Sequence, residues 1–310
     1  ALALALVLTP GRARTPRPAL WAVALGWLAS WLWRLDGAHI WQLVDLALVG
    51  PGLVFGAANR SGRSFRDGLL AGGAVCGLAA LGQAFLGRVM PFHWTASDWP
   101  WGRAAGTLGN PNVAGAYLAA LLPFALALER PRWLRWPLSG IFGAALLATG
   151  SRGGWIAAFA AVAYLLWRRR SPLFTTFPAL VLALAVLPWP PGARLLAGLS
   201  MRDPTAAARF AVWRRAIALF LARPAAGWGF EAPLGWASHP HNLFLEILVG
   251  GGLLAAAGFV PLALYLGRVI FRRGASEAAA PASLAALLVF GLADAVLGTP
   301  ALAAVFWLDV

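Results

Sequence analysis

Long apolar runs separated by short polar segments rich in Arg, Gly and Pro dominate the chain. Many of these runs approach the roughly 20 residues that a helix needs to cross a bilayer. A backbone in lipid must satisfy its own hydrogen bonds, so each run predicts a helix and not an open strand. The expected spans are residues 1–9 (partial), 19–35, 40–58, 67–87, 112–128, 133–149, 153–167, 172–189, 243–267, 281–297 and 300–310 (partial). The predicted fold is therefore all-α, a polytopic integral membrane helical bundle with about 10–11 spans in this sequence.

One polar segment, residues 190–242, is much longer than the others. It separates N-terminal transmembrane helices in residues 1–189 from C-terminal ones in residues 243–310, and we expect the two sets to form one membrane domain. Within the segment, residues 205–222 have the period of an amphipathic helix. Its predicted apolar stripe consists of Phe210, Trp213, Ile217 and Phe220. Such a helix is expected to lie in the membrane interface.

Arginine placement predicts the orientation. Five arginine clusters fall on alternate loops: Arg12, Arg14 and Arg17; Arg60, Arg63 and Arg66; Arg130, Arg132 and Arg135; Arg168, Arg169 and Arg170; Arg268, Arg272 and Arg273. The positive-inside rule makes that side cytoplasmic. The long segment and the short turns near residues 106–112 and 149–154 then face the opposite, outer side.

Composition narrows the function classes. The chain has 310 residues, of which 60% are hydrophobic and 12% charged, against about 25% charged residues in soluble domains. In a membrane protein the net charge of +14 indicates cytoplasmic loops near anionic headgroups and not nucleic acid binding. All 25 basic residues are Arg, which excludes a lysine nucleophile. The single cysteine, Cys76, excludes an internal disulfide and a cysteine metal site. Because the sequence begins at Ala1 inside an apolar run and ends inside another, we interpret it as part of a longer protein.

The first candidate constellation ends the long segment. His239, His241 and Asn242 directly precede the span that begins at Leu243, and Glu246 follows one turn later. A neutral imidazole can act as a general base near neutral pH, whereas the alternative is an ordinary helix entry with Asn242 as the N-cap. A metal site is not expected, because carboxylates on the outer side are few and no paired aspartates occur.

The second constellation is the turn TGSRGG at residues 149–154. We expect the next helix to start near Gly153, where its free N–H groups and the charge of Arg152 favour an anion. The neighbouring glycines allow a bulky group to approach the backbone. The alternative is an arginine that snorkels to the membrane edge.

Further candidates lie elsewhere on the predicted outer side and inside spans. The turn GTLGNPN at residues 106–112 opens a helix that Asn110 or Asn112 can cap, which is ordinary turn chemistry unless it also shapes a site. Additional candidates are Arg103, Arg209 and Arg214. Acidic residues within spans are functional candidates because charge in a bilayer is costly; these are Asp45, Glu246 and Asp294. They would also suit the proton relay of a transporter.

The ordered set of motifs resembles the O-antigen ligase and O-antigen polymerase superfamily. The matching motifs are GTLGNPN at 106–112, TGSRGGW at 149–155, Arg209 with Trp213, P..GWGF at 224–230 and HPHNLFLEILVGGG at 239–252. No single motif is specific, but their order and the long outer segment are. The resemblance covers the chain from about residue 100 onward, and the N-terminal spans fit in character only.

The resemblance implies a glycosyltransferase of the bacterial inner membrane with its active site facing the periplasm. It would transfer a glycan from undecaprenyl diphosphate to an acceptor hydroxyl, such as a lipid A–core sugar, by a metal-independent, inverting reaction without cofactor. His241 would be the base and Arg152 and Arg209 would bind the diphosphate, with His239 as a weaker candidate.

The residue chemistry agrees with that reaction. A departing diphosphate carries negative charge that must be stabilised, and guanidinium groups suit phosphate oxygens. An O-antigen polymerase or a protein O-oligosaccharyltransferase would share the donor and differ in acceptor. A transporter of bicarbonate or of a lipid-linked sugar is the alternative of another class, although transporter sites usually lie at the bilayer midplane.

Overall fold

The computed structural model describes most of the chain after residue 61. The described residues are 62–86, 93–94, 102–129, 131–187, 190–198, 204–229, 232–235, 237, 239–272, 274, 277–294, 296, 302 and 305. The first three expected spans, Asp45 among them, lie outside this part, as does nearly all of the last expected span.

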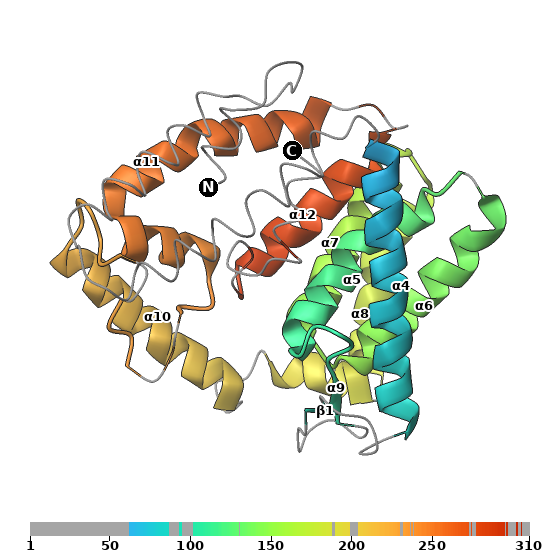
Figure 1. Ribbon diagram of the computed structural model, residues 1–310, viewed down its shortest axis with the longest axis horizontal. Coiled ribbons are helices and arrows are strands. Elements are labelled where there is room, and N and C mark those ends of the chain that lie inside the picture. Colours follow the sequence, from blue (N-terminus) through green and yellow to red (C-terminus); the bar gives the residue numbers. More distant parts are fainter. Residues whose placement is uncertain are drawn as a thin grey trace.

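Seven expected spans coincide with helices (Figure 1). These are α4 (Gly62–Leu86), α5 (Pro111–Leu126), α6 (Arg135–Ala148), α7 (Arg152–Arg168), α8 (Leu173–Val186), α11 (Leu243–Arg272) and α12 (Ala279–Gly291). In the described part, two helices are long and apolar enough to cross a membrane, at Arg66–Leu86 and Leu243–Phe271, and a third span results if α8 and the next helix are one bent span. The prediction of an all-α membrane protein is confirmed, while the number of spans remains a prediction.

The long segment between α8 and α11 contains two helices, α9 (Pro190–Ala197) and α10 (Pro204–Ala222). The predicted amphipathic helix is present as α10, and Phe210 and Ile217 of its predicted apolar stripe are exposed. The buried face of α10 consists of Val212, Ala216 and Leu219. These side chains pack with residues of the following loop and of α11, so the position of those partners selects the buried face, and not the size of the aromatic residues.

Two short elements were not predicted. A short 3-10 helix, η2 (Arg132–Leu134), precedes α6. Strands β1 (His93–Trp94) and β2 (Arg103–Ala104) form an antiparallel two-stranded ribbon at one end of the bundle (Figure 1). Two-residue strands carry no sequence periodicity from which to predict them.

The main core lies between α4, α5, α6, α7 and α12, together with the second half of α11. Close helix approach depends on small residues, as is typical of membrane helices. A Cβ on Gly154 of α7 would lie 2.9 Å from the backbone carbon of Gly115 in α5. A Cβ on Gly115 would in turn lie 2.7 Å from the Cβ of Ser151. This contact places the first turns of α5 and α7 side by side.

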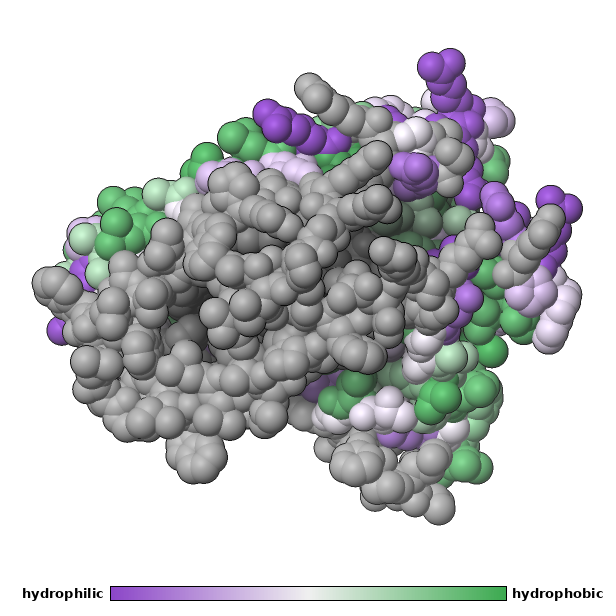
Figure 2. Space-filling model, turned by 45° about the horizontal axis from the view of Figure 1, so that its top comes forward, coloured by the Kyte–Doolittle hydropathy of each residue, from purple (hydrophilic) through white to green (hydrophobic). Residues whose placement is uncertain are grey.

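The helix α11 is broken at Gly252, which has φ 63° and ψ −159°. The loop after α10 supplies hydrogen bonds at the break: Trp228 N donates to Val249 O, and Leu253 N donates to Pro224 O, each at 2.7 Å. The first half of α11 therefore packs with α10 in a separate cluster, and both stand beside the main bundle in Figure 1. Hydrophobic residues reach the surface in several places (Figure 2), as lipid contact requires.

Hydrogen bonds join the last turns of α7 and α11. Tyr164 donates to Ile270 O, and Arg168 donates from Nη1 to Phe271 O, so the C-terminal ends of α7 and α11 lie together. Two of the predicted arginine clusters thus share one end of the molecule.

Candidate functional site

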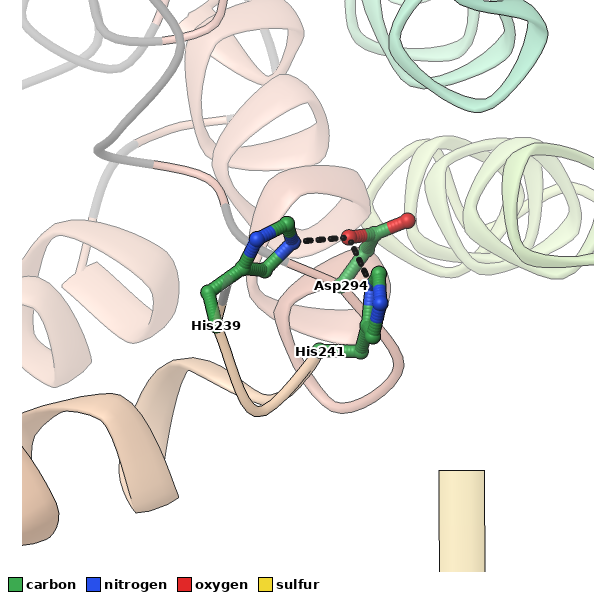
Figure 3. Close-up of side chains that lie close together, drawn as sticks. All are labelled: His239, His241 and Asp294. Carbon is green, nitrogen blue, oxygen red and sulfur yellow. Dashed lines mark hydrogen bonds and ion pairs between the residues drawn. The ribbon is translucent and has the colours of Figure 1, made fainter. Parts of the chain in front are cut away.

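The site is centred on Asp294, just after α12. Its nearly buried carboxylate faces both histidines of the loop before α11 (Figure 3). Asp294 Oδ1 lies 3.3 Å from His239 Nε2 and 3.0 Å from His241 Nδ1. The other oxygen, Oδ2, accepts a hydrogen bond from Asn112 Nδ2 at 3.3 Å and lies 3.9 Å from Arg209 Nη2. Three segments distant in sequence thus converge on the carboxylate of Asp294.

Local bonds fix the loop that carries the histidines. Asn242 is the N-cap of α11, because its Oδ1 accepts from the backbone N–H groups of Phe244 and Leu245, each at 3.0 Å. Its Nδ2 donates to Leu292 O at 2.9 Å, which ties the start of α11 to the end of α12. Capping by Asn242 thus occurs together with the placement of both histidines at Asp294.

His241 has a left-handed backbone, with φ 50°. A non-glycine residue in this region costs about 1–3 kcal/mol and persists only where surrounding contacts hold it. Trp213 of α10 supplies one such contact, because its Nε1 donates to Pro240 O at 2.9 Å. Arg209, one turn earlier on α10, is thereby brought next to the histidines.

Arg103 connects two of the predicted motifs. Its Nε donates to Thr149 O at 3.0 Å, and its Nη2 donates to Asn112 Oδ1. Asn110 caps α5 by accepting from Asn112 N at 2.8 Å, so the side chain of Asn112 remains available to join Arg103 to Asp294. Of the two candidate caps in the turn, Asn110 caps the helix and Asn112 belongs to the site.

The turn between α6 and α7 presents Arg152 at the first position of α7. Ser151 is the N-cap and accepts from Gly154 N at 3.2 Å. The side chain of Arg152 packs over α9, where it lies near Gly198 and its Nη1 is 3.5 Å from Arg194 O. The buried Arg194 donates from Nε to Gly150 O at 2.8 Å. The helix α9 therefore holds the turn that carries Arg152.

The electrostatics of the site are dominated by positive charge. Burial, followed by the nearby charges of Arg152 and Arg209, lowers the pKa of Arg103 to about 10 against the opposing effect of Asp294. Three guanidinium groups thus act on a shared region, which favours a multiply charged anion. The hydrogen bond to Asp294 raises the pKa of His239 against the effect of burial, and the charge of Glu246 adds to this increase.

A metal ion was not expected, because carboxylates near the histidines seemed few. Asp294 overturns that reason, since ligand atoms of His239, His241 and Asp294 lie within 4.8 Å of one another. Two imidazoles and a carboxylate are suitable ligands for a divalent ion. The arginine charges that act on the same region oppose a bound cation, so the residues fit an anion better than a metal.

Most of the residues proposed from the sequence converge here. The structure brings together His239, His241, Asn242, Arg103, Asn112 and Arg209. The charge of Arg152 also acts on Arg103. Glu246 lies in the first turn of α11, where its charge acts on His239. Arg214 is exposed on α10.

Sequence reasoning missed the role of two residues. Asp294 was considered only as an acidic residue within a span, although its cost in a bilayer was the correct signal. Arg194 is one of several arginines of the long outer segment, and no motif distinguishes it from the others. Its burial, unusual for arginine, is a property that only the fold reveals.

The fold and site define an all-α membrane protein with a cationic, histidine-containing site where α5, α7, α11 and α12 begin or end. A family model described as Wzy_C, O-Antigen ligase, matches residues 137–260. Over these residues the chain is similar to the O-antigen ligase family. No curated protein matches the chain significantly.

The matched range covers the turn at Arg152, the helix α10 and the histidines, but neither Asn112 nor Asp294. The packing of α5 beside the end of α12 places these two residues in the site, where Asn112 donates to Asp294.

Proposed function

We propose that the protein transfers a glycan from undecaprenyl diphosphate to an acceptor hydroxyl at the periplasmic face, as an O-antigen ligase-like, inverting glycosyltransferase. The observation that carries this proposal is the arrangement of two histidines, Arg209 and Arg103 about Asp294, with the charge of Arg152 also acting on Arg103. A base and an anion site next to each other are what this reaction needs. The favoured acceptor is a lipid A–core sugar.

In the proposed reaction, the acceptor oxygen attacks the anomeric carbon of the donor sugar from the face opposite the diphosphate. The bond between that carbon and the phosphate oxygen breaks, and the diphosphate leaves with both bonding electrons. His241, donating its Nδ1 hydrogen to Asp294, takes the hydroxyl proton at Nε2. A general base of this kind contributes about 10²–10⁴-fold to the rate.

Arg103, Arg152 and Arg209 stabilise the charge that develops on the diphosphate. Guanidinium groups do this without a metal, because each can donate two hydrogen bonds to phosphate oxygens. The reaction is therefore proposed to be metal-independent. Asp294 holds the imidazole of His241 in one orientation and stabilises its protonated form, as carboxylates do beside catalytic histidines.

The test is transfer by purified protein in proteoliposomes, with a labelled undecaprenyl-diphosphate-linked glycan, candidate acceptors, and EDTA in parallel. Transfer to a lipid A–core acceptor with EDTA present supports the full proposal. Transfer to a glycan or a protein acceptor instead would indicate an O-antigen polymerase or a protein O-oligosaccharyltransferase. Loss of activity with EDTA would overturn the metal-free mechanism, and flux of the glycan without transfer would indicate a transporter.

A further inference from the structure

A glutamine outside every motif holds the backbone next to Arg103. Gln83 lies near the end of α4, and its side chain is only 2% exposed. Its Oε1 accepts from Ala105 N and Gly106 N, each at 2.9 Å, while its Nε2 donates to Gly106 O at 3.0 Å. One amide group thus satisfies three buried backbone groups of the loop that follows β2.

This loop lies directly on α4. Gly106 has φ 57°, and a Cβ there would lie 2.6 Å from Cys76 Sγ and 2.7 Å from Cys76 O. Ala104 and Ala105 are fully buried. The loop therefore has little freedom to move while Gln83 retains its bonds, and the position of the loop fixes the Cα of Arg103.

Arg103 requires an accurately placed backbone, since it spans two other segments. It reaches Thr149 O before α7 and Asn112 in α5. If loss of the Gln83 bonds let the loop move, Arg103 would lose both of these contacts. The same movement would also displace the guanidinium relative to Arg152 and Arg209, whose charges act on it.

We infer that Gln83 is a positioning residue that sets Arg103 for binding the donor diphosphate. This inference rests on the proposed function for the identity of the anion, but the geometry concerns only Gln83, the loop and Arg103. Gln83 acts through Arg103 and does not itself contact the substrate. The competing explanation is that Gln83 merely stabilises the loop as a part of the fold.

A double-mutant cycle separates the two explanations. The variants are Gln83→Leu, Arg103→Ala and the combination, all in the full chain reconstituted in proteoliposomes. Arg103→Ala is expected to raise the donor KM about tenfold, which corresponds to one lost charged hydrogen bond. Gln83→Leu should raise the donor KM several-fold while leaving the acceptor KM unchanged. The combined variant should be no worse than Arg103→Ala alone.

The control is Leu70→Ala, which removes a buried side chain of the same helix far from the loop. It should lower thermal stability and leave the donor KM unchanged. Independent, multiplying effects of Gln83→Leu and Arg103→Ala would overturn the inference, as would an unchanged donor KM in Gln83→Leu.

If Gln83→Leu does not fold, Gln83→Glu replaces it in the cycle, since its carboxylate still accepts from both N–H groups but has lost the amide donor to Gly106 O. If wild-type protein transfers no glycan, the proposed function fails, and the same cycle is read as binding of inorganic pyrophosphate by calorimetry. Weakened pyrophosphate binding in Gln83→Leu, and no further loss in the combined variant, would support the positioning role; unchanged binding would overturn it.

Discussion

Asp294 Oδ1 lies 3.0 Å from His241 Nδ1, although 53 positions separate the two residues. The contact joins the end of α12 to the start of α11. The bond from Asn242 to Leu292 O, 2.9 Å long, joins the same two segments beside it. The orientation of the His241 ring therefore depends on a carboxylate from another helix, in the manner of carboxylate–histidine pairs in hydrolases.

Asp294→Asn should lower kcat by about 10²-fold or more, because an amide no longer stabilises a protonated His241. The donor KM should stay unchanged or fall, since the substitution removes a negative charge near Arg209 and Arg103. Steady-state kinetics with varied donor would show this split. The matched control is Asp67→Asn, an exposed carboxylate beside Arg66. An increased donor KM with normal kcat would contradict the assignment.

His241→Ala should abolish measurable transfer, with a rate loss of about 10²–10⁴-fold, while the protein remains in the membrane. His239→Ala should cost less, because His239 is expected to support the charge of Asp294 and not to take the proton. His39→Ala, outside every motif, serves as the control. Initial rates from equal amounts of membrane-inserted protein provide the comparison. Full activity of His241→Ala would refute its role as the base.

Arg152→Ala and Arg209→Ala should each raise the donor KM by about 10–100-fold, the cost of a lost charged hydrogen bond to phosphate. The acceptor KM should change little. Arg169→Ala removes an exposed arginine at the other end of α7 and should behave as wild type. Normal donor kinetics in both site variants would mean that the diphosphate binds elsewhere.

The pH dependence of stability should reveal the pair formed by His239 and Asp294. The folded pKa of His239 is raised above its ordinary value of 6.5, chiefly by the hydrogen bond to Asp294. A raised pKa means that this stabilisation is fully present below pH 6.5 and is lost as pH rises through the folded pKa. The difference in thermal unfolding temperature between wild type and His239→Ala should therefore shrink as pH rises. A difference that grows with pH would contradict the assignment.

The sequence predicts the helices well because apolar runs in lipid leave the backbone few alternatives. It also singles out His241 and Arg152, which stand in turns at helix starts, whereas Arg209, inside α10, is indicated only by the resemblance. It does not predict the partner of the histidines. Asp294 lies 53 residues further along the chain, and only the packing of α12 beside α11 and α5 places it in the site.

The buried face of α10 shows the same limit in another form. Helical periodicity correctly predicts the helix, but several stripes of α10 are apolar, and Phe210 and Ile217 lie on an exposed one. The burial of Val212 depends on where the loop after α10 returns to α11. Such long-range pairing is not encoded in local spacing.

Gly252 offers a last test, because it joins the two halves of α11. Its φ of 63° and ψ of −159° lie in a region that is essentially restricted to glycine, and a Cβ would lie 2.4 Å from Ala225 O. Gly252→Ala should therefore destabilise the protein by about 3 kcal/mol or more. It should also reduce transfer, because the first half of α11 begins next to His241 and would shift with the loop after α10.

The matched control for Gly252→Ala is Gly140→Ala in α6, where a Cβ would meet nothing within 4 Å. Helix propensity alone should stabilise that variant by up to about 1 kcal/mol. Thermal unfolding in detergent, followed by circular dichroism, compares the two substitutions directly. Equal stabilities would show that the break in α11 is not required. A destabilised Gly252→Ala beside an intact Gly140→Ala would show that the broken helix, held by the loop after α10, keeps the histidines opposite Asp294.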